Sequence, residues 1–265
     1  AKRSPPDASR RKTPAPLAMA VLVTAIHNGG CATILRQPWI PHAGWLGLHH
    51  DEPSERHALC WDGQRSCPPG EHREGVAESF TKRYGLKRLV YAGRHDDIGA
   101  VIDALKRAVG SEAVGPYARV DPERVAVVGH SLGGAAALAM PRLRDDVDAV
   151  IALESPALGD IVGVTDGVFV WRAEALGVPV LNIYSDAAWG HLNEWPQYRR
   201  NAEWLSDAST DTEDLHVIGA GHFALTDLSL ASPTLVSLLE GQDQAERALT
   251  YLRAVNDACV DFLDR

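Results

Sequence analysis

The chain has 265 residues, of which 45% are hydrophobic and 23% are charged. A chain of this length and composition can bury a sizeable core, and α/β folds of this size often form one domain. The formal net charge of −9 provides no positive field of the kind that attracts phosphate backbones or anionic membranes, so we do not expect a nucleic acid partner.

The N-terminal residues 1–16 carry a cluster of basic side chains among prolines and serines, without an apolar period. We predict a disordered basic tail there, with a basic targeting or membrane-facing arm as the alternative, and a catalytic domain over residues 17–265. The apolar run at 17–26 is about half as long as the ~20 residues of a membrane span, so it predicts a buried strand and no transmembrane segment. No signal-peptide pattern is present, although the chain starts without Met, and we favour a secreted or periplasmic location over a cytoplasmic one.

Apolar runs rich in valine and isoleucine alternate with helical patterns along the chain. We predict strands over residues 18–26, 45–48, 124–128, 148–153, 178–184 and 215–218. Continuous apolar strands that are separated by helices are typical of a parallel sheet covered on both faces. The sequence therefore predicts an α/β fold, with a mostly parallel, doubly wound sheet flanked by helices in a single domain.

Two long segments have the apolar spacing of amphipathic helices. Residues 75–110 are predicted to be mostly helical, and residues 245–263 form a closing helix with Leu249 on its apolar side. Glycine and proline make residues 155–167 a predicted loop. The wider segment 155–171 is expected to be a mobile apolar cap over the functional site.

A nucleophile motif follows the predicted strand at 124–128. The sequence Gly129-His130-Ser131-Leu132-Gly133-Gly134 leads from this strand into a helical stretch at 135–140. Strand, turn and helix are the context that a G-x-S-x-G nucleophile elbow requires, because the glycines on either side let the chain pass closely while the serine Oγ projects above the sheet. A structural glycine-rich turn is the alternative, and the context favours Ser131 as a nucleophile.

Four segments carry a resemblance to a known superfamily. They are residues 121–124 (Asp-Pro-Glu-Arg), the elbow, residues 151–154 (Ile-Ala-Leu-Glu) and residues 221–228 (Gly-His-Phe-Ala-Leu-Thr-Asp-Leu). With these, residues 17–265 resemble the α/β-hydrolase superfamily, and more narrowly the platelet-activating-factor acetylhydrolase group with its polyester-hydrolase and chlorophyllase relatives. The resemblance implies a serine hydrolase that cleaves carboxylic esters without a cofactor.

An acyl-transfer enzyme needs N–H groups that stabilise negative charge on the carbonyl oxygen of its substrate. One is expected from Leu132, directly after the nucleophile. The resemblance implies that the second lies in the loop after residues 17–26, where relatives carry a His-Gly-x-Gly-like turn. This chain has His27-Asn28-Gly29-Gly30 at that place, so we expect the Gly29 N–H as the donor, with Gly30 as the alternative.

The base is expected to be a histidine, because its ordinary pKa near 6.5 lets one side chain accept the serine proton and return it to the leaving group. Eleven histidines are present. His222 follows a predicted strand late in the chain, within a glycine-flanked loop, as the serine, acid, histidine order of the superfamily requires. We therefore predict His222 as the base.

Two carboxylates are candidates for the acid that orients this histidine. Asp186 follows the next-to-last predicted strand, where many α/β hydrolases carry their acid, but the usual register falls on Ala188. Glu154 ends the preceding strand, at the point where the acetylhydrolase and chlorophyllase groups carry an aspartate. Glutamate serves in some triads, so we favour Glu154 and keep Asp186 as the alternative.

Other residues give weaker signals. Trp189 and Trp195 follow a strand end and either line a substrate pocket or belong to the core. Cys60 and Cys67 flank a turn-rich segment that could close as a small disulfide loop, with free thiols as the alternative. No cysteine or histidine spacing supports a zinc site, so we expect no metal.

The predicted reaction is hydrolysis of a small-molecule or polymeric carboxylic ester through an acyl-serine intermediate. Two other functions stay open. An acyltransferase would pass the same acyl group to an alcohol or amine other than water, and a non-catalytic protein would use the fold for binding. The sequence does not decide the oligomeric state.

Overall fold

A computed structural model of the protein describes residues 20–25, 92–109, 120–166, 168–207 and 211–265. Several predictions concern residues outside these ranges. They are the basic tail at 1–16, the strand at 45–48, the Cys60–Cys67 pair, the oxyanion donors Gly29 and Gly30, and residues 75–91 of the helical stretch predicted at 75–110.

Five parallel strands form the central sheet, in the order β1-β2-β3-β6-β7. The strands are β1 (Ala20–Ala25), β2 (Val125–His130), β3 (Ala149–Leu153), β6 (Val180–Ser185) and β7 (Thr212–Val217). The predicted parallel sheet is confirmed, and the strands overlap five of the six predicted ones. Because all five run in the same direction, their carboxyl ends meet at one edge of the sheet.

Two strand boundaries differ from the prediction for identifiable reasons. β2 continues through Gly129 and His130, because it pairs along this stretch with β1 on one side and β3 on the other. β7 begins at Thr212, and Ile218 lies outside it with 80% of its surface exposed. β7 is the last strand in the order of the described sheet, and its first residues are polar and only half-buried. These residues therefore lack the apolar run from which the other strands were predicted.

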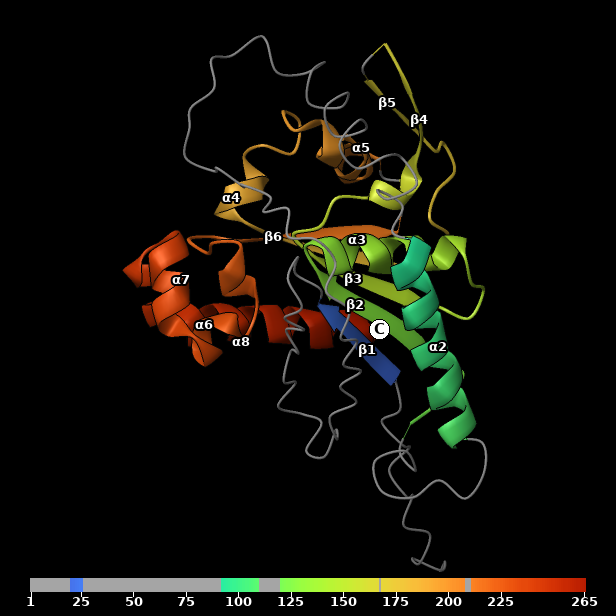
Figure 1. The fold of residues 1–265 in the computed structure, drawn as a ribbon, viewed down its shortest axis with the longest axis horizontal. Coiled ribbons are helices and arrows are strands. Elements are labelled where there is room, and N and C mark those ends of the chain that lie inside the picture. Colours follow the sequence, from blue (N-terminus) through green and yellow to red (C-terminus); the bar gives the residue numbers. More distant parts are fainter. Residues whose placement is uncertain (1–19, 26–91, 110–119, 167, 208–210) are drawn as a thin grey trace, which may run out of the picture.

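Alternate residues of each strand face opposite layers of the molecule, as the two-residue period of a strand requires. On one face, Val128, Ile151 and Ile183 pack against the closing helix α8 (Gln242–Leu263). On the other face, Val127 and Val150 pack against helices α2 (Ala92–Val109) and α3 (Leu132–Ala139). Figure 1 shows α2 and α3 on one side of the sheet and α8 on the other. The chain is therefore doubly wound, as predicted.

Helices cover both faces of the sheet, and helices or short turns follow the carboxyl ends of its strands. The α-helices are α2 (Ala92–Val109), α3 (Leu132–Ala139), α4 (Asp186–Trp189), α5 (Arg199–Ser206), α6 (Leu228–Ala231), α7 (Pro233–Glu240) and α8. Short 3₁₀ turns are η2 (Met140–Arg142), η3 (Leu158–Asp160), η4 (Pro196–Tyr198) and η5 (Phe223–Leu225). None of the described helices has the length and apolar character that crossing a membrane requires.

Leu249, predicted on the apolar side of α8, is instead 56% exposed.

The predicted loop at 155–167 contains regular structure, which corrects the sequence prediction. η3 is followed by β4 (Ile161–Thr165), which pairs antiparallel with β5 (Val168–Trp171). Ile161 and Phe169 are buried while their neighbours Val162 and Val168 are exposed, which is the alternation of a half-buried strand. Glycine within the short run concealed this alternation in the sequence.

A half-buried carboxylate on β7 has a raised pKa. Asp214 lies opposite Asn182 in the β6–β7 register. Burial raises the pKa of Asp214 from 3.8 to about 6, and contacts with Asn182 and Tyr184 offset only part of that rise. Because the pKa is raised in the folded state, the native protein binds this proton more tightly than the unfolded chain does. The resulting stability is fully present below pH 3.8 and is lost as the pH rises through about 6.

We therefore expect Asp214→Asn to increase the free energy of unfolding by about 1–2 kcal/mol at pH 8, because the neutral amide avoids the buried charge. The gain should vanish near pH 4, where the native carboxyl is already neutral. Urea unfolding of both proteins across this pH range measures the difference, with Asp257→Asn on the exposed side of α8 as the control. A stability difference that does not change with pH would contradict the expectation.

Candidate active site

The serine of the elbow lies in a strained turn between β2 and α3. Ser131 has φ 55° and ψ −120°, a conformation that non-glycine residues rarely adopt. Its N–H donates to the Leu153 carbonyl oxygen at 2.9 Å, which ties the turn to the end of β3. Such strain persists only where the surrounding structure enforces it, and it concentrates at functional sites.

The glycines of the elbow are required by close packing. A Cβ on Gly129 would overlap the backbone of Gly133, and a Cβ on Gly134 would overlap the Oγ of Ser155. α3 therefore lies directly against the ends of β2 and β3. This is the close passage that the spacing of the motif predicts.

Glu154 follows β3 and contacts His222. It is 4% exposed and also has a positive φ, 47°. Its Oε1 accepts a hydrogen bond from Nδ1 of His222 at 2.8 Å, and its Oε2 accepts one from the Ser185 N–H at 3.0 Å. The Tyr198 hydroxyl donates to the Glu154 carbonyl oxygen at 3.1 Å. Both side-chain oxygens are thus occupied by donors, which satisfies a buried carboxylate.

The surroundings of Glu154 keep it ionised. Burial alone would raise the pKa of this carboxyl, but the hydrogen bond and charge of His222, with the bonds from Ser185, outweigh burial and lower the pKa below its usual 4.5. Glu154 is therefore negative at neutral pH. An ionised acceptor at Nδ1 requires the proton on that nitrogen, which leaves Nε2 of the neutral ring free to accept another proton.

The loop of His222 is held by hydrogen bonds from several elements. Nε2 of His130 donates to the His222 carbonyl oxygen at 2.9 Å, and the two rings lie 4.3 Å apart. The Phe223 N–H donates to Oε1 of Glu240 at 2.9 Å. Because His130 directly precedes Ser131, the ring contact brings the His222 loop beside the elbow.

The alternative acid Asp186 lies against another histidine. Its Oδ1 accepts from Nε2 of His216 at 2.7 Å, and its side chain is 54% exposed. The structure thus brings Glu154 to His222 and leaves Asp186 beside His216.

The remaining candidates lie in two apolar clusters. Leu132 packs with Trp171 and other residues of the β4–β5 hairpin. Trp189 stacks on His216, with ring centroids 4.9 Å apart, and Trp195 stacks on His191 at 5.1 Å. Both tryptophans also pack at the edge of the cluster around Tyr184 and Tyr198.

A cleft of about 410 Å³ lies between β5 and the segment that leads into α5. Its lining includes Phe169, Trp171 and Pro196 on the apolar side and Arg199 and Glu203 on the polar side. Phe169 and Trp171 also belong to the apolar cluster of Leu132. Neither of the two tryptophans predicted for substrate binding lines this cleft.

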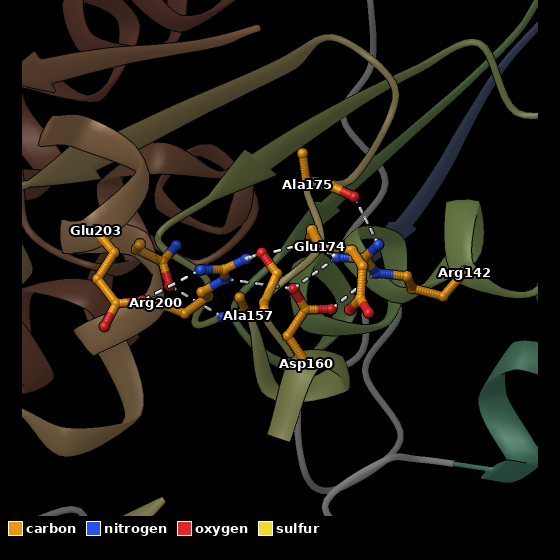
Figure 2. A network of polar contacts seen from close by, with 9 residues as sticks. Arg142, Ala157, Asp160, Glu174, Ala175, Arg200 and Glu203 are labelled. Carbon is orange, nitrogen blue, oxygen red and sulfur yellow. Dashed lines mark hydrogen bonds and ion pairs between the residues drawn. The ribbon is translucent and has the colours of Figure 1, made fainter. Parts of the chain in front are cut away.

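A buried ion pair network anchors the segment that was predicted to be a mobile cap. Asp160, whose side chain is 3% exposed, accepts two hydrogen bonds of 2.9 Å from Arg142. Arg200 approaches the same carboxylate at 3.6 Å and donates to the carbonyl oxygens of Ala173 and Glu174. Figure 2 shows the two guanidinium groups on opposite sides of Asp160. The base of the hairpin is therefore fixed to α5 and η2.

Part of the chain matches a known protein family. A sequence model of the acetyl xylan esterase family (AXE1) matches residues 101–166, which include β2, the elbow, β3 and Glu154. This match covers a short part of the chain, so the architecture follows from the parallel sheet, the doubly wound helices and the strained serine turn. The chain has the α/β-hydrolase fold. No curated protein sequence matches it.

Several solved structures are similar to this chain at low identity. A ferulic acid esterase from Streptomyces cinnamoneus has a TM-score of 0.44 and 22% identity, and the match covers 75% of this chain and 50% of that protein. An alpha-beta serine hydrolase homologue from Coxiella burnetii has a TM-score of 0.35 and 15% identity, and the match covers 62% of this chain and 59% of that protein. A dienelactone hydrolase-like promiscuous phosphotriesterase from metagenomic libraries has a TM-score of 0.35 and 17% identity, and the match covers 64% of each chain. The match thus spans between 50% and 64% of the length of these proteins.

Three residues that support the candidate site, Ser185, Tyr198 and His130, were not predicted from the sequence to do so. The Ser185 N–H and the Tyr198 hydroxyl hold Glu154, and His130 holds the His222 backbone. Ser185 carried a usable signal, because it ends a strand that neighbours β3 at the same sheet edge. Tyr198 comes from a 3₁₀ turn 44 residues after Glu154, and no local pattern indicates that contact.

The Asp160 network predicts a large loss of stability when the carboxylate is removed. Asp160→Asn should lower the free energy of unfolding by about 3 kcal/mol, because Arg142 and Arg200 would lose their shared counter-charge. Chemical denaturation measures the change. Asp166→Asn in the exposed hairpin turn is the matched control, since asparagine tolerates the positive φ of that residue. Equal stability of the two variants would show that the network does not anchor the hairpin.

Proposed function

We propose that this protein is a carboxylic ester hydrolase that works through an acyl-serine intermediate, with Ser131 as nucleophile, His222 as base and Glu154 as acid. The observation that carries the proposal is the 2.8 Å hydrogen bond between the buried Glu154 and Nδ1 of His222, beside a serine in a strained strand-to-helix turn. A nucleophile, a base and an acid that orients the base are the parts that this chemistry needs.

In the first step, Oγ of Ser131 attacks the ester carbonyl carbon while Nε2 of His222 takes the serine proton. Glu154 stabilises the imidazolium that forms, and it stays ionised because its pKa is lowered. The C–O bond to the alcohol then breaks, and His222 returns the proton to the leaving alcohol. The acyl group stays on Ser131 as an ester.

Negative charge on the carbonyl oxygen is stabilised by backbone N–H groups. Leu132 begins α3, so its N–H belongs to the first turn of the helix, where no intrahelical acceptor exists. We assign this N–H as one donor and keep Gly29, or Gly30 as the alternative, for the second. Each such donor typically contributes a few kcal/mol to the transition state.

In the second step, water attacks the acyl-serine carbonyl carbon and gives a proton to Nε2 of His222. The bond to Oγ breaks, the proton passes to Ser131, and the carboxylic acid leaves. The enzyme thereby returns to its starting state, with the proton of the imidazole again on Nδ1, facing Glu154.

The substrate class proposed is a carboxylic ester, either a small molecule or a polymer. Two observations support this class. The acetyl xylan esterase family model matches the segment with Ser131 and Glu154, and the motifs resemble those of the acetylhydrolase, polyester-hydrolase and chlorophyllase group. The family model and this resemblance both name enzymes that cleave carboxylic esters.

Ser131→Ala tests the proposed function. The variant should lose at least about a thousandfold in kcat for p-nitrophenyl acetate, because the acyl acceptor is gone, while its thermal unfolding midpoint stays close to that of the native protein. Ser237→Ala, a half-buried serine on α7, is the matched control and should hydrolyse the ester at the native rate. Full activity in Ser131→Ala would exclude Ser131 as the nucleophile.

A further inference from the structure

Asp186 makes three hydrogen bonds to the segment that leads into the His222 loop. Its Oδ1 accepts from Nε2 of His216 at 2.7 Å, and its Oδ2 accepts from the Gly219 N–H at 3.0 Å. Its own backbone N–H donates to the carbonyl oxygen of Ala220, also at 3.0 Å. One residue at the end of β6 therefore fixes the chain just before the candidate base.

The other side of this turn is held by α8. The Gly219 carbonyl oxygen accepts from the Tyr251 hydroxyl at 2.7 Å and from Nε2 of Gln244 at 2.9 Å. Gly219 has φ 83°, and a Cβ there would come within 3.0 Å of the Tyr251 hydroxyl. Gly219, three residues before His222, is thus held by hydrogen bonds from its N–H to Asp186 and from α8 to its carbonyl oxygen.

His216 is itself held in place. Its ring stacks on Trp189, with the centroids 4.9 Å apart and the planes inclined by 10°. Trp189 ends α4 and Asp186 begins it, so one short turn supplies both the stacking partner and the hydrogen-bond acceptor. This arrangement directs the Asp186 carboxylate toward the Gly219 N–H, and it explains the place of Trp189 better than substrate binding does.

We propose that Asp186 is a positioning residue, which holds the 216–220 turn so that the His222 ring meets both Glu154 and Ser131. The proposal rests on the proposed ester hydrolysis and adds to it a role for the carboxylate that follows β6. Asp186 does not act as the acid, because its two oxygens are taken by His216 and Gly219 while Glu154 takes Nδ1 of His222.

The size of the effect follows from how reaction rates depend on geometry. Misplacing a catalytic group by about 1 Å can cost on the order of a hundredfold in rate. Tyr251, Gln244 and Glu240 also hold this loop and would limit the displacement. We therefore expect removal of the Asp186 side chain to lower kcat about tenfold, with KM within a factor of about two, because the substrate contacts are unchanged.

Two substitutions at this residue separate a positioning role from an acid role. Asp186→Ala removes both acceptors and should show the tenfold loss in kcat for p-nitrophenyl acetate. Asp186→Asn keeps one acceptor oxygen and should restore most of the rate, with a loss of no more than about threefold. A triad acid behaves in the opposite way, because the amide stabilises the wrong tautomer of the histidine and the rate collapses.

Rates should be expressed per active site, counted by the endpoint of fluorophosphonate labelling, so that a smaller folded fraction does not appear as a lower kcat. Asp257→Ala, an exposed aspartate on α8, is the matched control and should keep the native rate. His216→Ala provides a second variant, which should lose about threefold because Asp186 keeps its bond to Gly219.

The outcomes distinguish a positioning role of Asp186 from an acid role and from failure of the proposed function. Native kcat per site in Asp186→Ala overturns the positioning role, and a loss of a hundredfold or more in Asp186→Asn shows that Asp186 is the acid. The proposed function fails separately, if the native protein has no ester hydrolysis that depends on Ser131, and the positioning role then falls with it.

Discussion

The hydrogen bond between Glu154 and His222 joins two parts of the chain that are 68 residues apart, and the arrangement of the site depends on it. It can form because β3 and β7 run in the same direction and end at the same edge of the sheet. β6 lies between them, and its last residue, Ser185, donates its N–H to the second oxygen of Glu154. A buried carboxylate with donors on both oxygens stays ionised, and an ionised Glu154 fixes which nitrogen of His222 carries the proton.

Two residues of the candidate site, Ser131 and Glu154, have strained backbones. Ser131 and Glu154 directly follow the neighbouring strands β2 and β3, and both have positive φ. The Ser131 N–H is bound to Leu153, and the Glu154 N–H is bound to the Ile183 carbonyl oxygen at 2.7 Å. These bonds to the next strand hold each residue in its unfavourable conformation. The parallel sheet thereby offsets a local cost of about 1–3 kcal/mol for each strained residue.

Much of the fold could be predicted from the sequence, because buried parallel strands are continuous apolar runs and the elbow has a fixed spacing of glycines. The pairing of Glu154 with His222 agrees with a prediction that rested on the resemblance to hydrolases with an aspartate at this point, and the catalytic role of both stays a prediction. The β4–β5 hairpin was missed because glycine interrupts its alternation. The contacts of Asp186 with His216 depend on the register of β6 against β7, in which Tyr184 lies opposite His216, and a single sequence does not contain that register.

The central claim is that Glu154 is the acceptor for Nδ1–H of His222, and proton NMR tests it most directly. A histidine Nδ1–H bound to a buried carboxylate gives a strongly deshielded proton signal, far from the amide region. We expect this signal in the native protein and in Asp186→Asn, and we expect it to be lost in His222→Gln and to move strongly toward the amide region in Glu154→Gln. Loss of the signal in Asp186→Asn, with an unchanged signal in Glu154→Gln, would contradict the account.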